Sequence, residues 1–82
     1  MVKVDYDEKF KITMLKIKDN LLKVKIKKQL SKIIRNPEIG KPMRYGRKGS
    51  RELYVKPFRL SYVYIKSENK IVVNDLYHKK AQ

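Results

Sequence analysis

Apolar and polar side chains alternate on both sides of Pro57, and this alternation constrains the fold more than any other feature of the chain. Because successive side chains of a β-strand point to opposite faces, the pattern predicts two antiparallel strands, 51–56 and 58–65, joined by a tight turn. Proline suits the second position of a turn, so we expect Lys56 and Arg59 to form the pair that closes it. The buried face would then contain Leu53, Val55, Leu60 and Tyr62, and the open face Tyr54, Lys56, Arg59 and Ser61.

This register makes the turn end of the hairpin strongly basic. It also places Val55 opposite Leu60, Tyr54 opposite Ser61 and Leu53 opposite Tyr62. Two cations side by side, Lys56 and Arg59, repel each other unless an anion lies between them. The open face therefore favours an RNA backbone as ligand, with Tyr54 as a ring for stacking. The alternative is that both cations simply extend into water.

The first half of the chain has helical spacing after a short strand. Alternation over residues 1–6 predicts that strand, and Asp7 offers an N-cap to the helix that follows. The first helix would bury Phe10, Met14 and Ile17. A second helix would end at Asn36-Pro37, because the residue before a proline is pushed out of the α region. Its apolar stripe would contain Leu22, Ile26, Leu30, Ile33 and Ile34, and its opposite face Lys25, Lys28, Lys32 and Arg35.

The complete order predicted is β-α-α-β-β-β-β, an α+β fold. An N-terminal strand and an antiparallel helical hairpin precede a four-strand antiparallel meander, with the helices on one sheet face. This order needs an edge strand over 43–48, a turn over 67–70 and a last strand over 71–77. The continuous apolar run of the last strand predicts a central position in the sheet. We expect residues 1–82 to form a single domain.

The charge of the chain indicates its partners. It has 22 Lys and Arg against 8 Asp and Glu, a formal net charge of +14 over 82 residues. Such a charge repels itself and lowers stability unless a polyanion or an acidic protein neutralises it. Since 37% of the residues are charged, the core is thin. We therefore expect a nucleic acid or an acidic protein partner, held in a habitual complex.

Several kinds of chemistry are excluded by residues that the sequence lacks. It has no cysteine and one histidine, so the usual zinc ligands are missing. Its eight acids show no paired spacing for a two-metal nuclease, and its three glycines form no phosphate-binding loop. We expect no metal and no cofactor. No window approaches the roughly 20 apolar residues of a membrane span, and no signal-peptide stretch occurs, so we expect a cytoplasmic location.

Short motifs in a fixed order make the chain resemble a known toxin family. The motifs are Asn36-Pro37, Gly40-Lys41-Pro42-Met43, Gly49-Ser50-Arg51-Glu52-Leu53-Tyr54-Val55, Phe58-Arg59-Leu60-Ser61-Tyr62, Ile71-Val72-Val73 and Leu76-Tyr77-His78-Lys79-Lys80. Their order and spacing resemble the RelE/ParE toxin superfamily, and specifically its RelE-type mRNA interferases. The resemblance implies the toxin of a type II toxin–antitoxin pair. Its partners would be an acidic, RelB-like antitoxin and the ribosome with its mRNA.

The resemblance also implies a reaction, that of a ribosome-dependent, metal-independent endoribonuclease. It would cleave mRNA in the A site by attack of a ribose 2′-hydroxyl on the adjacent phosphate. This chemistry needs a base for the 2′-proton, cations for the pentavalent phosphorane and an acid for the leaving oxygen.

Matching positions assign candidate catalytic residues. Arg59 would clamp the scissile phosphate with its guanidinium, and Lys56 would be the base if neighbouring cations lower its pKa. Lys79, or Lys80 in the alternative register, would stabilise charge in the transition state or on the leaving group. His78 is the only histidine available for proton transfer at neutral pH, although a lone histidine here can also be incidental.

The same match assigns residues that bind RNA without reacting. Tyr54 would stack on a base. Many RelE-type members carry a later tyrosine that stacks on the substrate base, and this sequence lacks it. Either Tyr77 or Tyr54 takes its place, or the activity is lower or ordered differently. The other RNA-binding candidates are Arg51, Arg44, Arg47, Lys48 and Lys80.

Two other functions remain open on this fold. A ParE-like toxin would bind DNA gyrase and would not need Lys56, Arg59 and Lys79. A non-catalytic RNA- or ribosome-binding module would use the same cations only to hold phosphates. For either toxin, Leu21 and Val24 lie off the core stripe of the second helix. They would receive an antitoxin segment or be ordinary surface hydrophobes.

Overall fold

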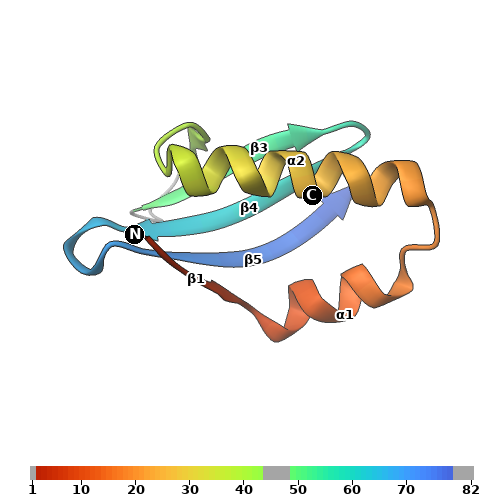
Figure 1. Cartoon of the computed structure of the whole chain (residues 1–82), viewed down its shortest axis with the longest axis horizontal. Helices are drawn as coiled ribbons and strands as arrows, with labels where there is room; N and C mark the ends of the chain where they lie inside the picture. The colour runs from red at the N-terminus through yellow and green to blue at the C-terminus, as the bar shows by residue number, and fades with distance from the viewer. Residues whose placement is uncertain (1, 44–48, 79–82) are drawn as a thin grey trace.

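The computed structural model describes residues 2–43 and 49–78, which form two helices and a five-stranded sheet (Figure 1). The elements are β1 Lys3–Tyr6, α1 Glu8–Lys16, α2 Asn20–Arg35, β2 Lys41–Pro42, β3 Ser50–Val55, β4 Phe58–Ile65, the 3₁₀ turn η1 Lys66–Glu68 and β5 Lys70–His78. The strand order is β1-β5-β4-β3-β2, with β1 parallel to β5 and the other pairs antiparallel. Both helices lie on one face of the sheet. This confirms the predicted α+β class and leaves the second face open.

The helix boundaries follow from local chemistry, as predicted. The Asp7 carboxylate accepts a hydrogen bond from the Lys9 N–H at 3.4 Å and caps α1. The Asp19 carboxylate accepts from the N–H groups of the first turn of α2, at 2.9 and 3.3 Å. These bonds satisfy donors that a helix start leaves without partners. At its other end α2 stops at Arg35, directly before Asn36-Pro37.

The core lies between the helices and the covered face of the sheet. Its fully enclosed members are Phe10, Ile26, Ile33, Val55, Leu60, Tyr62, Ile71, Val73 and Leu76. Leu22 and Leu30 pack against this set, so four of the five predicted stripe positions of α2 contact the core. Ile34 is the exception, because its side chain is 40% exposed.

The predicted register of the hairpin is wrong. Val55 pairs with Phe58, so Lys56 and Pro57 are the two central residues of the turn, and Lys56 does not face Arg59. The peptide bond between Lys56 and Pro57 is cis, the form that turns adopt when proline is their third residue. The observed pairs are therefore Tyr54 with Arg59, Leu53 with Leu60, Glu52 with Ser61 and Arg51 with Tyr62.

The face assignments of the hairpin survive this error. Val55, Leu60 and Tyr62 are buried and Leu53 packs against them, as predicted. Tyr54 and Lys56 are exposed, as predicted, and Arg59 is partly so. Ser61 pairs with Glu52 and therefore shares the open face with it, as predicted, but is only 8% exposed because it lies in the middle of the sheet between Glu52 and Asp75.

An edge strand, a turn and a last strand are present, but their bounds differ from the predicted ones. Residues 44–48 of the predicted edge strand lie outside the described residues. The edge strand that pairs with β3 is the shorter β2, at Lys41 and Pro42. The predicted turn over 67–70 consists of η1 and Asn69, which adopts a left-handed φ of 48°. β5 lies between β1 and β4, which confirms its predicted central position.

One buried hydroxyl fastens the loop after α2 to the sheet. The Tyr62 O–H donates to the Pro37 carbonyl at 2.6 Å and accepts from the Gly40 N–H at 2.9 Å. Beside it, the Arg51 guanidinium donates to the carbonyls of Glu38 and Gly40, at 2.9 and 2.8 Å. We call this set, Pro37, Glu38, Gly40, Arg51 and Tyr62, the loop clamp. It fixes the path of the chain into β2, at the border of the open face.

The loop clamp makes stability depend on pH. Burial raises the pKa of the Tyr62 phenol above its usual 10.0, against a smaller lowering by the Gly40 N–H. The folded state therefore favours the neutral phenol. Its stabilising contribution is complete below pH 10 and is lost as pH rises through the higher folded pKa. We expect the difference in unfolding free energy between the parent and Tyr62→Phe to be constant up to about pH 9 and to shrink above pH 10. Denaturant unfolding from pH 7 to 11 measures it; a constant difference up to pH 11 would contradict the expectation.

Candidate functional site

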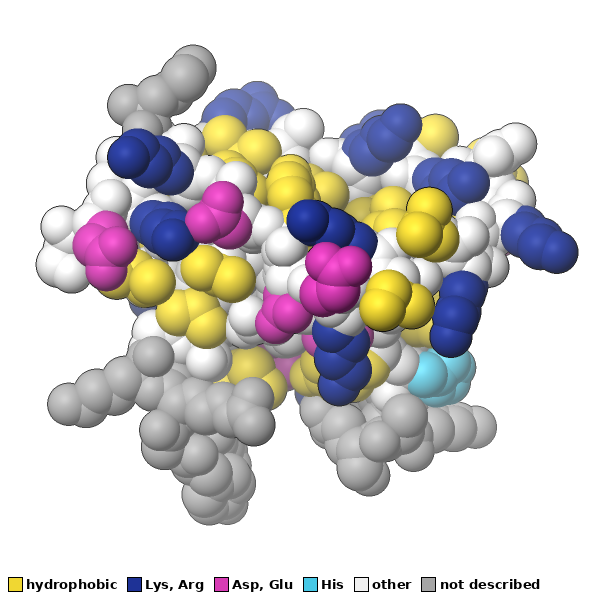
Figure 2. Space-filling view, turned by 90° about the horizontal axis from the view of Figure 1, so that it is seen from below, with side chains coloured by type: hydrophobic (Ala, Val, Ile, Leu, Met, Phe, Trp, Pro, Cys, Tyr) yellow, Lys and Arg dark blue, Asp and Glu magenta, His cyan; other side chains and the backbone are white. Residues whose placement is uncertain are grey.

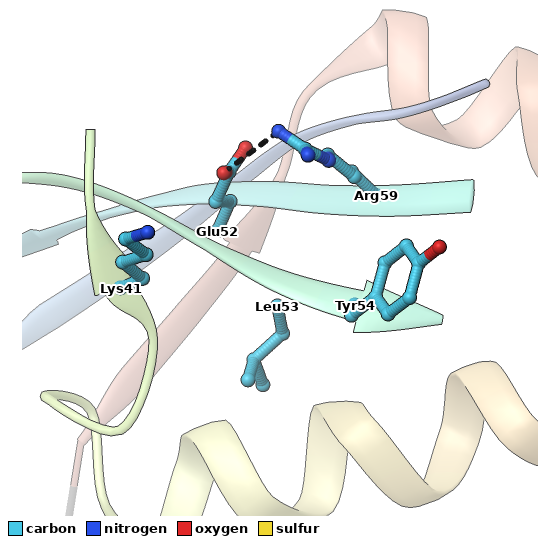
Figure 3. Close-up of a pocket in the computed structure, with 5 residues that line it drawn as sticks. All are labelled: Lys41, Glu52, Leu53, Tyr54 and Arg59. Atoms are coloured by element: carbon cyan, nitrogen blue, oxygen red, sulfur yellow. Dashed lines mark hydrogen bonds and ion pairs between the residues drawn. The ribbon is translucent and has the colours of Figure 1, made fainter. Parts of the chain in front are cut away.

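Two tyrosines and an arginine form a row across the open face of the sheet. Arg59 of β4 pairs with Tyr54 of β3 on one side and with Tyr77 of β5 on the other. Side chains directly opposite in paired strands point to the same face. Figure 3 shows Tyr54 and Arg59 on the side away from α2, whereas Leu53 points toward that helix.

Glu52 holds this row together. Its Oε1 lies 3.1 Å from Nη1 of Arg59 (Figure 3). Its Oε2 accepts a hydrogen bond from the hydroxyl of Tyr77 at 2.8 Å. The side chains of Arg59 and Glu52 are 27% and 19% exposed, so water screens this ion pair only in part. One carboxylate thus ties together side chains from three neighbouring strands and fixes the direction of the guanidinium.

A hollow of about 250 Å³ lies over this cluster. Its lining residues are Lys41, Glu52, Leu53, Tyr54 and Arg59. Two cations, an aromatic ring and one carboxylate therefore surround the same small volume. A phosphate that entered it would meet Arg59 in the geometry that suits a guanidinium, and would compete with Glu52 for that side chain. We call this the open-face hollow.

Sequence reasoning missed the role of Glu52. The residue was recognised only as part of a motif, because its partner depends on the register of the hairpin. In the observed register, Glu52 lies diagonally from Arg59, at a separation that long side chains span. An acid two residues before Tyr54 was the only available signal.

Lys56 lies elsewhere. It is exposed in the turn and lines a second hollow between α2 and β3, together with Lys25, Lys28 and Lys32. It is not among the residues that line the open-face hollow. The lysines of α2 were predicted to point away from the sheet, and they instead border this groove.

His78 and Arg59 lie on opposite faces of the sheet. His78 pairs with Phe58 and contacts its ring edge-on, at 5.5 Å between centroids. Phe58 packs against the core, and its neighbour in sequence, Arg59, points to the open face. Because side chains alternate along β5, Tyr77 joins the Arg59 row and His78 does not.

The other predicted residues divide into two groups. Arg51 belongs to the loop clamp, where it also lies 3.7 Å from the Glu38 carboxylate. Lys79, Lys80, Arg44, Arg47 and Lys48 lie outside the described residues. Within residues 2–43 and 49–78 no group of His, Asp or Glu side chains is arranged to hold a metal ion. In the same part of the chain, neither helix has the length and apolar character that crossing a bilayer requires.

Comparison with known proteins identifies the fold. No protein-family profile matches the chain, and no curated protein sequence does. Solved structures do match. The isolated E. coli RelE toxin gives a TM-score of 0.81 at 19% identity, over 95% of this chain and 84% of that one. A chain of the Mycobacterium tuberculosis RelBE2 toxin–antitoxin complex gives 0.78 at 19%, over 95% and 98%. A chain of the E. coli DinJ–YafQ complex gives 0.76 at 20%, over 99% and 97%.

Two helices on one face of a sheet ordered β1-β5-β4-β3-β2 are thus an arrangement that small bacterial toxins share. The chain has the RelE-type toxin fold, as its motifs led us to expect. At 19–20% identity the likeness concerns the fold, and function has to be argued from the site.

Proposed function

We propose that this chain is the toxin of a type II toxin–antitoxin pair and that it cleaves mRNA in the ribosomal A site. The observation that carries the proposal is the RelE-type fold with a fixed arginine, Arg59, on its open face. The reaction would be attack of a ribose 2′-hydroxyl on the adjacent phosphate, without a metal, in the cytoplasm. The bond from phosphorus to the 5′-oxygen of the next nucleotide breaks, which leaves a cyclic phosphate and, once that oxygen takes up a proton, a 5′-hydroxyl. Cleavage at that bond needs positioning and cations more than new covalent chemistry.

Arg59 is the residue to which we assign the scissile phosphate. Glu52, itself held by the Tyr77 hydroxyl, fixes the guanidinium before substrate arrives, so binding has to order little more of this side chain. Tyr54, 48% exposed at the rim of the open-face hollow, provides a ring for base stacking. Lys41 adds a second positive charge at the same rim. We retain Lys79 as the proposed charge stabiliser near the leaving group.

The two residues that the sequence suggested for proton transfer lie away from Arg59. Lys56 as base and His78 as acid both require RNA to reach around the edge or end of the sheet, since neither lines the open-face hollow. Glu52 does line it, but its two carboxylate oxygens already accept hydrogen bonds from Arg59 and Tyr77. We therefore propose Glu52 as a positioning residue for Arg59.

An acidic antitoxin is the second partner that we propose. Tyr6, Ile12, Leu15, Leu21 and Val24 are large hydrophobic residues exposed on β1, α1 and the start of α2. Leu15 and Leu21 are the most exposed of these, at 85% and 74%. Figure 2 shows hydrophobic side chains lying between lysines and arginines on the face seen from below. An amphipathic acidic segment would cover the apolar side chains and neutralise the surrounding charge.

The experiment that tests the proposed function is mapping of mRNA ends on programmed ribosomes after addition of the folded chain. Cuts within the A-site codon, absent when ribosomes are omitted, are the expected result. A folded chain that binds ribosomes without cutting mRNA would overturn the nuclease proposal. Inhibition of DNA gyrase supercoiling by the same preparation would then support the ParE-like alternative.

Glu52→Gln is expected to separate binding from cleavage. The substitution removes a negative charge beside the phosphate site, so we expect RNA to bind about 3- to 10-fold more tightly. The amide has a single acceptor oxygen, so when it accepts from Arg59 its N–H₂ group faces the Tyr77 hydroxyl. The bond to Arg59 also loses its charge assistance, and Arg59 is less firmly held. We therefore expect cleavage on the ribosome to fall by about 10-fold or more.

Fluorescence anisotropy with a labelled RNA and the ribosome assay measure the two effects in one preparation. Glu38→Gln is the matched control, because Glu38 pairs with Arg51 in the loop clamp and not with Arg59. Tighter binding with unchanged cleavage in the Glu52 variant would show that Glu52 does not position Arg59.

A further inference from the structure

A second hollow lies on the other side of the β3 edge, between β3 and α2. Its volume is also about 250 Å³. The lining residues are Lys25, Lys28, Gln29, Lys32, Tyr54, Val55 and Lys56. None of these lining residues is acidic. We call this hollow the α2 groove.

The cations of the α2 groove form an ordered row. Lys25, Lys28 and Lys32 are spaced at i, i+3 and i+7, so they share one side of the helix over about 10 Å. Lys56 faces them from the hairpin turn. A row of this length holds several negative charges along a line, as in a polyanion, better than it holds a single small anion.

Gln29 places a hydrogen-bond acceptor among these cations. Its Nε2 donates to the Tyr54 carbonyl at 2.8 Å, which fixes the orientation of the amide. Its Oε1 is buried and has no hydrogen-bond partner within the described residues. A buried acceptor without a donor is unfavourable, so a ligand that donates to it gains affinity.

The α2 groove and the open-face hollow lie next to each other at Tyr54, which lines both. Among the described residues, β2 pairs with β3 only at Arg51 and Glu52. The edge of β3 from Leu53 to Val55 therefore has no neighbouring strand there.

We propose that the α2 groove binds single-stranded RNA next to the segment whose phosphate Arg59 holds. The lysines contact successive phosphates, and Gln29 Oε1 accepts from a ribose 2′-hydroxyl or a base amino group. This assignment deepens the proposed function and rests on it for the identity of the bound strand. Acidic side chains would satisfy the lysines but only accept hydrogen bonds, so they would leave Oε1 unpaired.

The test compares two triple variants of equal charge in the full-length chain. Lys25→Gln/Lys28→Gln/Lys32→Gln removes the row, and Lys11→Gln/Lys16→Gln/Lys18→Gln removes three exposed lysines in and directly after α1. The probe is a fluorescein-labelled single-stranded RNA of eight nucleotides, whose integrity is checked on a gel. Binding is measured by anisotropy between 50 and 300 mM salt, alone and in competition with a glutamate-rich helical peptide.

We expect the groove variant to bind RNA about 10- to 100-fold more weakly and to lower the slope of log affinity against log salt by about 2, at roughly 0.7 per lost contact. The α1 variant should change affinity by no more than a few-fold. Gln29→Met should weaken binding about 3- to 10-fold without changing the salt slope, because it alters no charge. Its melting temperature shows whether the fold is kept.

The outcomes separate this inference from the proposed function. Equal losses in the two triple variants would overturn the inference, even if the parent cleaves mRNA on ribosomes. Loss of peptide binding with RNA binding retained would also overturn it, and would make the groove a docking site for an acidic protein. A groove-specific loss of RNA affinity in a chain that does not cleave mRNA would support the inference and contradict the proposed reaction.

Discussion

Replacing Arg59 by alanine is expected to lower mRNA cleavage on the ribosome by about 100-fold or more. Removing one preorganised donor to a developing negative charge typically has an effect of 10²–10³ on rate. Here the loss is compounded, because Arg59 is the only arginine among the described residues that line the open-face hollow. Mapping and quantifying A-site cuts at equal folded concentration measures the effect. Arg35→Ala removes the same charge from the exposed end of α2 and should change cleavage by less than a few-fold.

The substitution leaves Glu52 in a partly buried position without its ion pair, which lowers stability by itself. Arg59→Ala/Glu52→Gln removes both charges and is expected to fold as the parent does while still failing to cleave. If this double variant cuts mRNA at the parental rate, Arg59 has no part in the reaction. Circular dichroism melting of all four proteins separates misfolding from lost chemistry.

The second large effect concerns the loop clamp. Tyr62→Phe deletes the hydroxyl that serves both Pro37 and Gly40, and leaves a buried N–H and a carbonyl unpaired. We expect it to lower the free energy of unfolding by about 1–3 kcal/mol. Tyr64→Phe is the control on the same strand, since no hydrogen bond of its hydroxyl is found within the described residues, and should change stability by less than about 0.5 kcal/mol.

Gly40→Ala tests the same clamp from the other side. A Cβ at residue 40 would lie 2.6 Å from the Tyr62 hydroxyl and 2.8 Å from its ring, so the loop has to move. We expect a loss of about 1–3 kcal/mol, as for other overpacked sites. Because the two substitutions disturb one contact, the double variant Gly40→Ala/Tyr62→Phe should lose less stability than the sum of the two single losses. Denaturant unfolding at pH 7 measures the two single variants and the double variant. Strictly additive losses would show that residue 40 and Tyr62 are not coupled.

The hairpin shows why the sequence predicts faces better than partners. The predicted and observed registers differ by two residues, since Arg59 was matched to Lys56 and pairs with Tyr54. A shift of one residue would exchange the two faces, but a shift of two returns each side chain to its own face. Alternation thus identified the buried side chains correctly, but it did not determine the register. The register depends on whether the proline is the second or the third residue of the turn.

The site is less predictable because it depends on those partners. Arg59 was identified from the sequence, but its contacts with Glu52 and Tyr77 follow from the pairing of β3, β4 and β5. For the same reason His78 appeared to accompany Arg59, although one step along β5 moves a side chain to the other face. The lysines of α2 were predicted to point away from the sheet, but they border a hollow beside β3. Helical spacing tells which side chains lie opposite the apolar stripe, but it does not tell how far the neighbouring sheet extends beside the helix.

The parallel pairing of β1 with β5 has a consequence for the order in which the molecule can be made. Lys3 pairs with Lys70, so β1 leaves the ribosome well before the strand that it pairs with. Until β5 is present, β4 has a bare edge, the core lacks Ile71 and Val73, and the guanidinium of Arg59 lacks the neighbour that Tyr77 provides. Pairing over so long a separation is slow compared with local structure. A nascent or truncated copy that ends before β5 therefore lacks the cluster of Glu52, Arg59 and Tyr77, which forms only when the third of these strands is in place.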